Sequence, residues 1–231
     1  LFKKKIIKND LYFNDIENEY DLIINSDQNN YISKKYFSKK LTKNYNSNAY
    51  TTIISHKDCR NNVAIQIFTR NKTSIVFSIL NKENLDEKDI SNLIKKYNLN
   101  YKIYKIGKID KFKLKFSLLR KYFYKNLLAF GDCIHQIHPL AGQGFNMSIR
   151  DIVVLAQIID QRIELGFEID SSISKIFENK SKSSNFIFSS GVDFIYEFFK
   201  FDNRIKNNFS KPIFDYFDNK TQLNKYLKNL A

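Results

Sequence analysis

Glycine, proline and cysteine are scarce in this chain, which has six, two and two of them among 231 residues. Cys59 and Cys133 lie far apart and outside any C-x-x-C pair, which excludes a disulfide framework and argues against a zinc site. No apolar run reaches the roughly eighteen residues of a membrane-spanning helix, and we identify no signal peptide. We therefore expect a protein of the reducing cytoplasm.

Three short signatures are also missing: the G-x-G-x-x-G of dinucleotide-binding domains, the G-x-S-x-G nucleophile elbow and the P-loop. Hydrolase chemistry therefore has no support from the sequence. The chain begins at Leu1, and its one methionine is Met147. We interpret it as part of a longer protein.

Basic residues outnumber acidic ones, 38 to 24, which gives a formal net charge of +14. Such a balance suits nucleic acid or an anionic membrane surface. The lysines are scattered along the chain, however, which indicates a compositional bias, and we expect no nucleic-acid partner. Residues 102–116, KIYKIGKIDKFKLKF, interleave lysine with aromatic residues; a solvated strand face explains this pattern, and single-strand nucleic-acid binding remains an alternative.

The informative residues gather between Leu127 and Asp151, where three of the six glycines and two of the three histidines occur. Residues 127–130 are apolar and predict a short buried strand that stops at Gly131. A loop follows, and then a helical pattern. The apolar residues predicted to share one face of that helix are Phe145, Ile149, Ile152, Val153, Ala156, Ile159 and Ile163.

A strand, a glycine-bearing loop and a helix start in succession form a suitable anion site. Glycine lets a backbone approach a ligand closely, and the N-terminus of a helix favours negative charge. Asp132 follows the strand and is placed to accept hydrogen bonds from ligand hydroxyls. An ordinary strand-to-helix turn, in which Asp132 merely caps the helix, is the alternative, because a lone Gly-x-Gly is a weak motif.

The complete string, GD-x-x-H-x-x-x-P-x-x-G-x-G-x-N-x-x-x-x-D in residues 131–151, resembles the second flavin-binding motif of the FAD-dependent aromatic hydroxylases. Its HPLAGQG core is most similar to the ubiquinone-biosynthesis branch, the 2-polyprenylphenol hydroxylases. One departure is Cys133-Ile134, where the family has two small residues. The resemblance implies an α/β fold: the C-terminal part of a FAD/NAD(P)-binding Rossmann-like flavoprotein monooxygenase, with a β-sheet substrate domain and C-terminal helices.

The resemblance also implies an activity. An enzyme of this family uses FAD, NAD(P)H and O2 to hydroxylate the aromatic ring of a polyprenylated phenol in ubiquinone biosynthesis. The implied partners are that phenol and, on the periphery of the inner membrane, a quinone-biosynthesis complex. The cofactor-binding residues that it implies are Asp132, Pro139, Gly142, Gln143, Gly144, Phe145, Asn146 and Asp27. No catalytic residue is assigned. No metal is expected, because His135 and His138 lack a third ligand.

A weaker resemblance lies in YDLIINSDQNNYISK, residues 20–34. It is similar to the family's Asp-Gly motif and keeps the acid as Asp27, but Gln28 replaces the glycine, Tyr31 a serine and Lys34 an arginine. Asp27 as a plain turn residue is therefore an alternative. Together with the missing G-x-G-x-x-G, these changes keep open a second function, a non-catalytic scaffold for quinone biosynthesis.

We predict four regions along the chain. They are residues 1–37, the end of the FAD-binding domain; 38–125, the substrate-domain sheet; 126–165, the FAD-binding strand, loop and helix; and 166–231, the C-terminal helical region. Strands are predicted at residues 5–7, 10–13, 20–24, 50–54, 63–68, 74–79, 101–106 and 111–118, the last two as exposed or edge strands, and a surface helix at 83–97. Gln66 and Phe68 are candidates for the substrate side of the sheet.

The C-terminal region is rich in phenylalanine at helical spacing, which predicts amphipathic helices whose aromatic residues form the core. The alternative is that some of them line a tunnel for a polyprenyl tail. The residues concerned are Phe177, Phe186, Phe188, Phe194, Phe198, Phe199, Phe209, Phe214 and Phe217.

Overall fold

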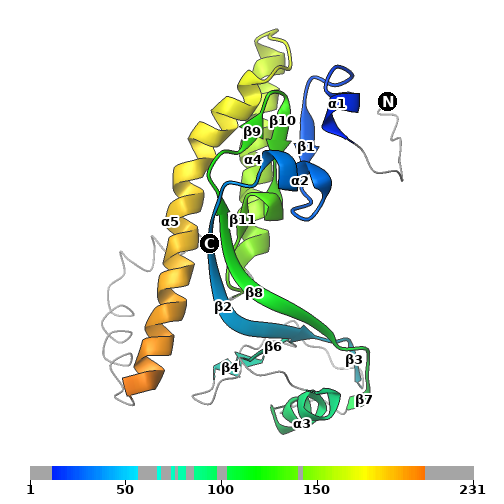
Figure 1. Ribbon diagram of the computed structural model, residues 1–231, viewed down its shortest axis with the longest axis vertical. Helices are drawn as coiled ribbons and strands as arrows, with labels where there is room; N and C mark the ends of the chain where they lie inside the picture. The colour runs from blue at the N-terminus through cyan, green and yellow to red at the C-terminus, as the bar shows by residue number, and fades with distance from the viewer. Residues whose placement is uncertain are drawn as a thin grey trace. The chain divides into compact units, whose positions relative to one another are not determined.

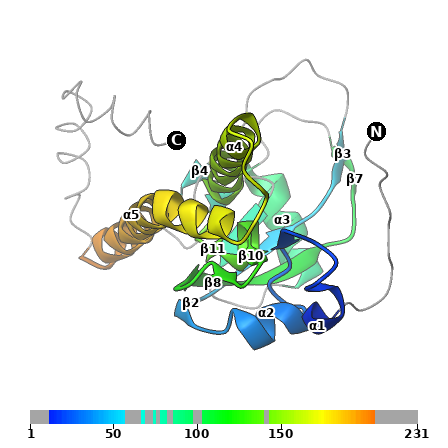
Figure 2. The same ribbon diagram turned by 90° about the horizontal axis from the view of Figure 1, so that it is seen from above.

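The computed structural model describes residues 12–56, 67–68, 74–75, 78–81, 86–97, 103–139 and 143–205. Two compact units divide the chain (Figures 1 and 2). The described part of the first lies within residues 1–42 and 117–197, and that of the second within residues 43–116 and 198–212.

The first unit contains a three-stranded sheet in the order β1-β10-β9, formed by Ile23–Asn25, Leu127–Ala129 and Phe123–Tyr124. Strand β1 runs parallel to β10, with Asn25 opposite Ala129, and β9 is antiparallel to β10. Lys125, with φ of 52°, makes the tight turn between β9 and β10. The parallel pair brings two segments about a hundred positions apart in sequence to the same edge of one sheet.

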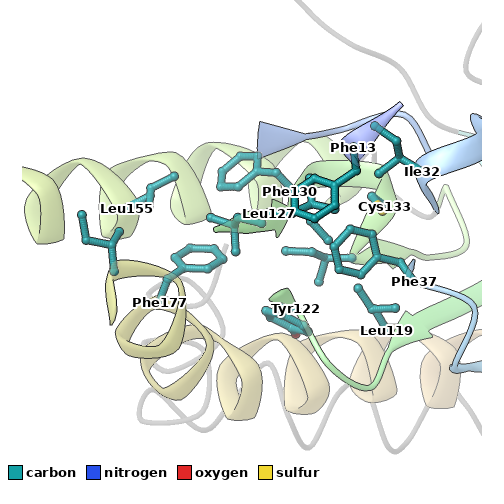
Figure 3. Close-up of a cluster of buried hydrophobic side chains, with 14 of the residues drawn as sticks. Phe13, Ile32, Phe37, Leu119, Tyr122, Leu127, Phe130, Cys133, Leu155 and Phe177 are labelled. Carbon is teal, nitrogen blue, oxygen red and sulfur yellow. The ribbon is translucent and has the colours of Figure 1, made fainter. Parts of the chain in front are cut away.

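Strand β10 is the centre of the first unit's core. Leu127, Leu128 and Ala129 are completely buried, as expected for a strand covered on both faces. In Figures 1 and 2, the helices α1 (Phe13–Ile16) and α2 (Tyr31–Tyr36) lie on one side of the strands, and α5 (Ser172–Ile205) lies on the other. Figure 3 shows the cluster that results, in which the rings of Phe130 and Phe177 stack at 5.7 Å.

Helix α4, Gln143–Glu164, packs through a different face from the one that the apolar pattern predicts. Its buried residues are Met147, Asp151, Leu155 and Ile158. The predicted apolar face is largely exposed instead, with Phe145 at 73% and Ile152 at 50%. The predicted helix is confirmed, but burial falls on another face, where Asp151 takes part in hydrogen bonds with other elements.

Helix α5 confirms the helical prediction from Ser172 to Ile205; residues 206–231 lie outside the described part of the chain, Phe209, Phe214 and Phe217 among them. Phe177 is core, as predicted, whereas Phe186 and Phe194 are 50% and 70% exposed. The buried face of α5 carries small polar residues in their place. They are Ser174, Ser181, Asn185 and Ser189.

A six-stranded sheet has the order β11-β8-β2-β6-β5-β4. The strands are His135–Gln136, Asp110–Leu119, Lys40–Thr51, Ser78–Asn81, Ser74–Ile75 and Ile67–Phe68. Strand β8 is predicted from its alternating lysines as an exposed or edge strand, but it lies between β11 and β2 and is buried from Phe116 to Leu119. The edge assignment is wrong because β8 has a neighbouring strand on each side. The predicted exposure holds only for the first half of the strand. The sequence does not predict the polar beginning of β2 either.

The second unit also holds a two-stranded sheet of β3 (Ile54–His56) and β7 (Ile103–Ile106) and the helix α3 (Glu87–Tyr97). Ile90 and Ile94 of α3 pack with Tyr50, which confirms the helical spacing. Val63 to Gln66 lie outside the described residues, and of Phe68 only its place in β4 is described. The substrate-side assignment of Gln66 and Phe68 stays a prediction, as do the four predicted regions.

Near the start of the chain, Phe13 begins α1 rather than ending a strand, and the rest of that predicted strand, apart from Tyr12, lies outside the described residues. The strand predicted at residues 20–24 is confirmed as β1 but begins at Ile23. Helix α2 is not predicted, although Asn30 is a typical N-cap, whose side-chain oxygen accepts from the Ser33 amide at 2.8 Å.

Candidate functional site

The flavin-motif segment folds as strand, tight turn, short strand and helix. After β10 the chain turns through the 3-10 helix η1, Gly131–Cys133, and continues into β11, which pairs with β8. Gly131 has φ of 55°, in the left-handed region that favours glycine. A Cβ atom built on it would lie 3.7 Å from the Ser148 hydroxyl, so the turn lies beside the second turn of α4 and glycine is required there by conformation rather than by space.

Of the predicted cofactor residues, Asp132 is exposed while its neighbours Gly131 and Cys133 are buried. Pro139 is exposed, and so are Phe145 and Asn146 in the first turn of α4, with Gln143 and Gly144 half-buried. Gly142 lies outside the described residues. The structure therefore leaves the predicted side chains outside the core, and it brings η1 next to α4 as the motif requires.

Asp27 follows β1 as Asp132 follows β10. Because β1 and β10 are parallel neighbours, both acids lie beyond the carboxyl ends of adjacent strands, the edge at which α/β sheets bind ligands. The Asp27 carboxylate accepts a 2.7 Å hydrogen bond from the Asn29 amide and so shapes its own turn. This contact fits both the turn role and the weaker cofactor role that the sequence predicts.

A buried polar cluster joins these two strand ends. The Asn25 amide donates to the Ser33 hydroxyl at 2.7 Å, and that hydroxyl lies 3.3 Å from the Cys133 sulfur. Asn30 donates to the Asn25 side-chain oxygen at 2.6 Å. Cys133 and Ile134, the departure from the family pattern, are buried at 1% and 0% exposure, so they pack into the core rather than against the exposed side of the loop.

A second buried network supports the helix start. The His135 Nε2 lies 3.0 Å from Asp151 Oδ2, and both side chains are almost fully buried. The Asn185 amide donates to both Asp151 oxygens at 3.2 and 3.1 Å, and Arg150 donates to the Asn185 oxygen at 3.0 Å. Strand β11, helix α4 and helix α5 are thus joined around one carboxylate. These contacts give Arg150 and Asp151 a structural role, because they hold α4 to β11 and α5.

His138 is buried beside the exposed Pro139, and its ring stacks on Tyr196 with 4.2 Å between centroids. Burial lowers the pKa of His138 to about 4, against a smaller opposing influence of Asp193, which favours a neutral imidazole. In the described residues no group of three His, Cys, Asp or Glu side chains is placed to hold a metal.

The donor set fits a phosphate-bearing, ribityl-linked flavin. The first-turn amides of a helix have no carbonyl partner within it, and the first turn of α4 contains no acidic residue that would compete for them. An exposed carboxylate, Asp132, belongs to η1, which packs beside α4, and can accept hydrogen bonds from hydroxyl groups. Amides that favour negative charge, beside a hydroxyl acceptor, suit the electron-rich ring of a flavin and its ribityl chain.

Sequence reasoning missed the residues that hold the site from behind. Asn25, Ser33 and Asn185 are each buried at 7% or less. The polar residues beside the apolar run of β1 offered a signal for Asn25, because a polar residue that ends a buried strand is a frequent hydrogen-bonding position. Nothing near Asn185 in the sequence indicates its partner on α4, 34 positions earlier.

Comparison with known proteins identifies the family of this chain. The sequence model of a family described as "FAD binding domain" matches residues 25–164, and one described as "Squalene epoxidase" matches residues 104–228. The ubiquinone biosynthesis monooxygenase COQ6 of Dictyostelium discoideum is 30% identical over 95 residues, 41% of this chain and 19% of that protein. The 3-demethoxyubiquinol 3-hydroxylase of Escherichia coli is 35% identical over 77 residues, 33% of this chain and 20% of that protein.

Among solved structures, p-nitrophenol 4-monooxygenase PnpA from Pseudomonas putida superposes with a TM-score of 0.62 at 10% identity, over 88% of this chain and 57% of that one. The likeness confirms the α/β fold with sheets and C-terminal helices. The matched part of this chain spans about a fifth of the two curated relatives. With residues 25–164 matched by the FAD-binding model, the chain belongs to the FAD-binding monooxygenase family.

Proposed function

We propose that this protein is a FAD-dependent monooxygenase that hydroxylates the ring of a polyprenylated phenol for ubiquinone biosynthesis. In the balanced reaction, the phenol, O2, NAD(P)H and a proton give the hydroxylated phenol, NAD(P)+ and water. The observation that carries the proposal is that η1, which holds the exposed Asp132, packs beside α4, whose first turn has no acidic residue. The substrate class is supported by the ubiquinone-pathway names of two partial relatives.

Each residue of the site has a proposed contact. Asp132 lies at the ribityl or phosphate region of FAD and accepts hydrogen bonds from the ribityl hydroxyls, and Asn146 with the helix start faces the pyrimidine edge of the flavin. Pro139 and residues 142–144 form the loop against the ring. The positive end of α4 favours negative charge on the ring when it is reduced. Bound FAD would supply the redox chemistry that takes electrons from NAD(P)H and activates O2.

The nicotinamide donor is the second half of the proposal. Asp27, at the same sheet edge as Asp132, is our candidate for a second cofactor contact. Gln28 replaces the glycine that the family has next to this acid, which favours the second candidate function, a scaffold without turnover. Oxidation of NADH or NADPH that depends on an added prenylphenol would exclude the scaffold.

Flavin retention tests the proposal directly. In the protein produced from its complete reading frame, we expect Asp132→Ala to weaken FAD binding by about 10- to 100-fold, the value of one or two hydrogen bonds to a charged group. Asp160→Ala, an exposed acid farther along α4, is the matched control and should bind FAD normally. Fluorescence titration with FAD measures both. Equal affinities for the two variants, or no FAD binding by the parent protein, would overturn the assignment.

A further inference from the structure

A groove in the first unit is not used by the proposed site. It has a volume of about 740 Å³ and lies where the end of β8 and the beginning of β2 meet α5. Its lining residues are Leu41, Leu118, Leu119, Arg120, Tyr122, Lys182, Ser183, Phe186 and Ile187. A groove of this size falls within the range of about 300–1,000 Å³ that small-molecule sites occupy in proteins.

The walls of this groove, here called the β8–α5 groove, are mainly apolar, and their rim is open to solvent. Phe186 is 50% exposed and Ile187 is 59% exposed on α5, and Leu41 is 45% exposed on β2. These large side chains face the solvent because the buried face of α5 is taken by its small polar residues. An exposed apolar rim around a cavity indicates a surface that binds an apolar group.

The charge of the groove is positive. Lys182 is paired with Glu178 at 2.7 Å, which leaves its charge largely balanced. Arg120 is exposed and takes part in no ion pair among the described residues. Its backbone amide donates to the Lys39 carbonyl at 3.0 Å, and this bond brings the pair Lys39-Lys40 beside Arg120-Lys121. Of these residues Arg120 lines the groove, together with Lys182, and it supplies the exposed positive charge there.

We propose that the β8–α5 groove docks an anionic phospholipid at a bilayer surface. One acyl chain lies against Phe186, Ile187 and Leu41, and the phosphate lies at Arg120. None of the helices in the described part of the chain has the length and apolar content needed to span a bilayer. Charge complementarity favours an anionic lipid, because the choline of a zwitterionic headgroup cancels the phosphate charge that would attract Arg120.

Two contributions combine in this contact. Burial of a phenylalanine side chain and attraction of a single cation to an anionic surface are each large enough to measure in a partition experiment. We expect Phe186→Asp to lower vesicle binding about tenfold and Arg120→Glu to lower it about fivefold or more.

The experiment is flotation of the protein with vesicles of phosphatidylcholine alone or mixed with phosphatidylglycerol, without added FAD. The protein should float with the mixed vesicles and not with the neutral ones. Phe186→Asp and Arg120→Glu should each remain in the dense fraction. Two matched controls should float like the parent: Phe167→Asp, an equally exposed phenylalanine in the first unit, and Lys175→Glu, an exposed cation on α5.

Three outcomes would overturn the proposal. If Phe186→Asp floats normally while salt abolishes binding, the attraction comes only from the net charge of the chain. If neutral vesicles are bound as well as anionic ones, the groove selects an apolar chain without a charged head. If the control variants lose vesicle binding together with the groove variants, the lipid-binding surface is not confined to the β8–α5 groove. Ile187→Asp repeats the apolar test in case Phe186→Asp changes the circular dichroism spectrum.

This proposal is independent of the proposed function. Flotation is measured without cofactor or substrate, and Arg120 and Phe186 lie outside the residues assigned to FAD. Loss of vesicle binding with normal flavin affinity, or the reverse, therefore identifies which of the two proposals has failed.

Discussion

The two sides of the segment from Gly131 to Asp151 differ in what their residues contact. On one side Asp132, Pro139 and Asn146 reach solvent; on the other, His135 and Asp151 are buried and hydrogen-bonded to other elements. The two sets alternate along a single stretch of chain. One motif can therefore contain two classes of residue, one that is open to a ligand and one that holds the backbone, and burial distinguishes them.

The buried side should respond most strongly in stability. In Asp151→Ala, His135 and the Asn185 amide lose their acceptor, which costs about 1–3 kcal/mol for each buried group. Chemical denaturation followed by circular dichroism measures the loss. Asp151→Asn should lose less, because an amide oxygen can still accept one bond.

The matched control for the carboxylate is Asp160→Ala on the exposed face of α4, which should change the free energy of unfolding by no more than about 0.5 kcal/mol. An Asp151→Ala protein as stable as this control would show that the buried network contributes nothing.

His138 should make the buried side sensitive to acid. Its pKa is lowered from 6.5 to about 4 by burial, so the unfolded chain binds a proton more readily than the folded one between these values. Stability is therefore full above about pH 6.5 and falls as the pH drops toward 4, by up to about 3 kcal/mol. His138→Phe, which retains an aromatic ring for stacking on Tyr196, should flatten this part of the pH profile. The free energy of unfolding is measured by urea denaturation at several pH values. If it falls with pH in His138→Phe as steeply as in the parent protein, the assignment is contradicted.

The smallest expected effect is on the turn between the two sides. Gly131→Ala forces a side chain into a left-handed backbone conformation and should destabilise the protein by about 1–2 kcal/mol. Gly191→Ala is the control with the opposite sign: it lies within α5, nothing lies within 4 Å of its new methyl group, and it should stabilise by about 0.5–1 kcal/mol. The melting temperatures of the two variants should shift in opposite directions. A shift in the same direction would contradict the argument that the positive φ of Gly131 disfavours alanine there.

Local sequence predicted the elements whose signals are contained in one segment. Strand β10 is a purely apolar run, α3 has apolar residues at helical spacing, and the break at Gly131 is marked by the glycine itself. These features depend on the period of hydrophobic residues and on backbone freedom, which a single segment records.

What the sequence did not predict depends on distant partners. The buried face of α4 contains Asp151, which is acceptable inside the protein only because His135 and Asn185 satisfy its oxygens. The sulfur of Cys133 lies beside Ser33, 100 positions earlier. A pattern within one helix cannot indicate such pairings, because the compensating hydrogen bonds come from other elements.

The placement of Cys133 also has a use in the laboratory. Its thiol is 1% exposed, and burial raises its pKa, so the reactive thiolate is both shielded and rare in the folded state. In a Cys59→Ser background, the rate at which a thiol-specific dye labels Cys133 would report how often the β1–β10 edge opens. The same kinetics, recorded with and without FAD, would show whether the cofactor slows that opening.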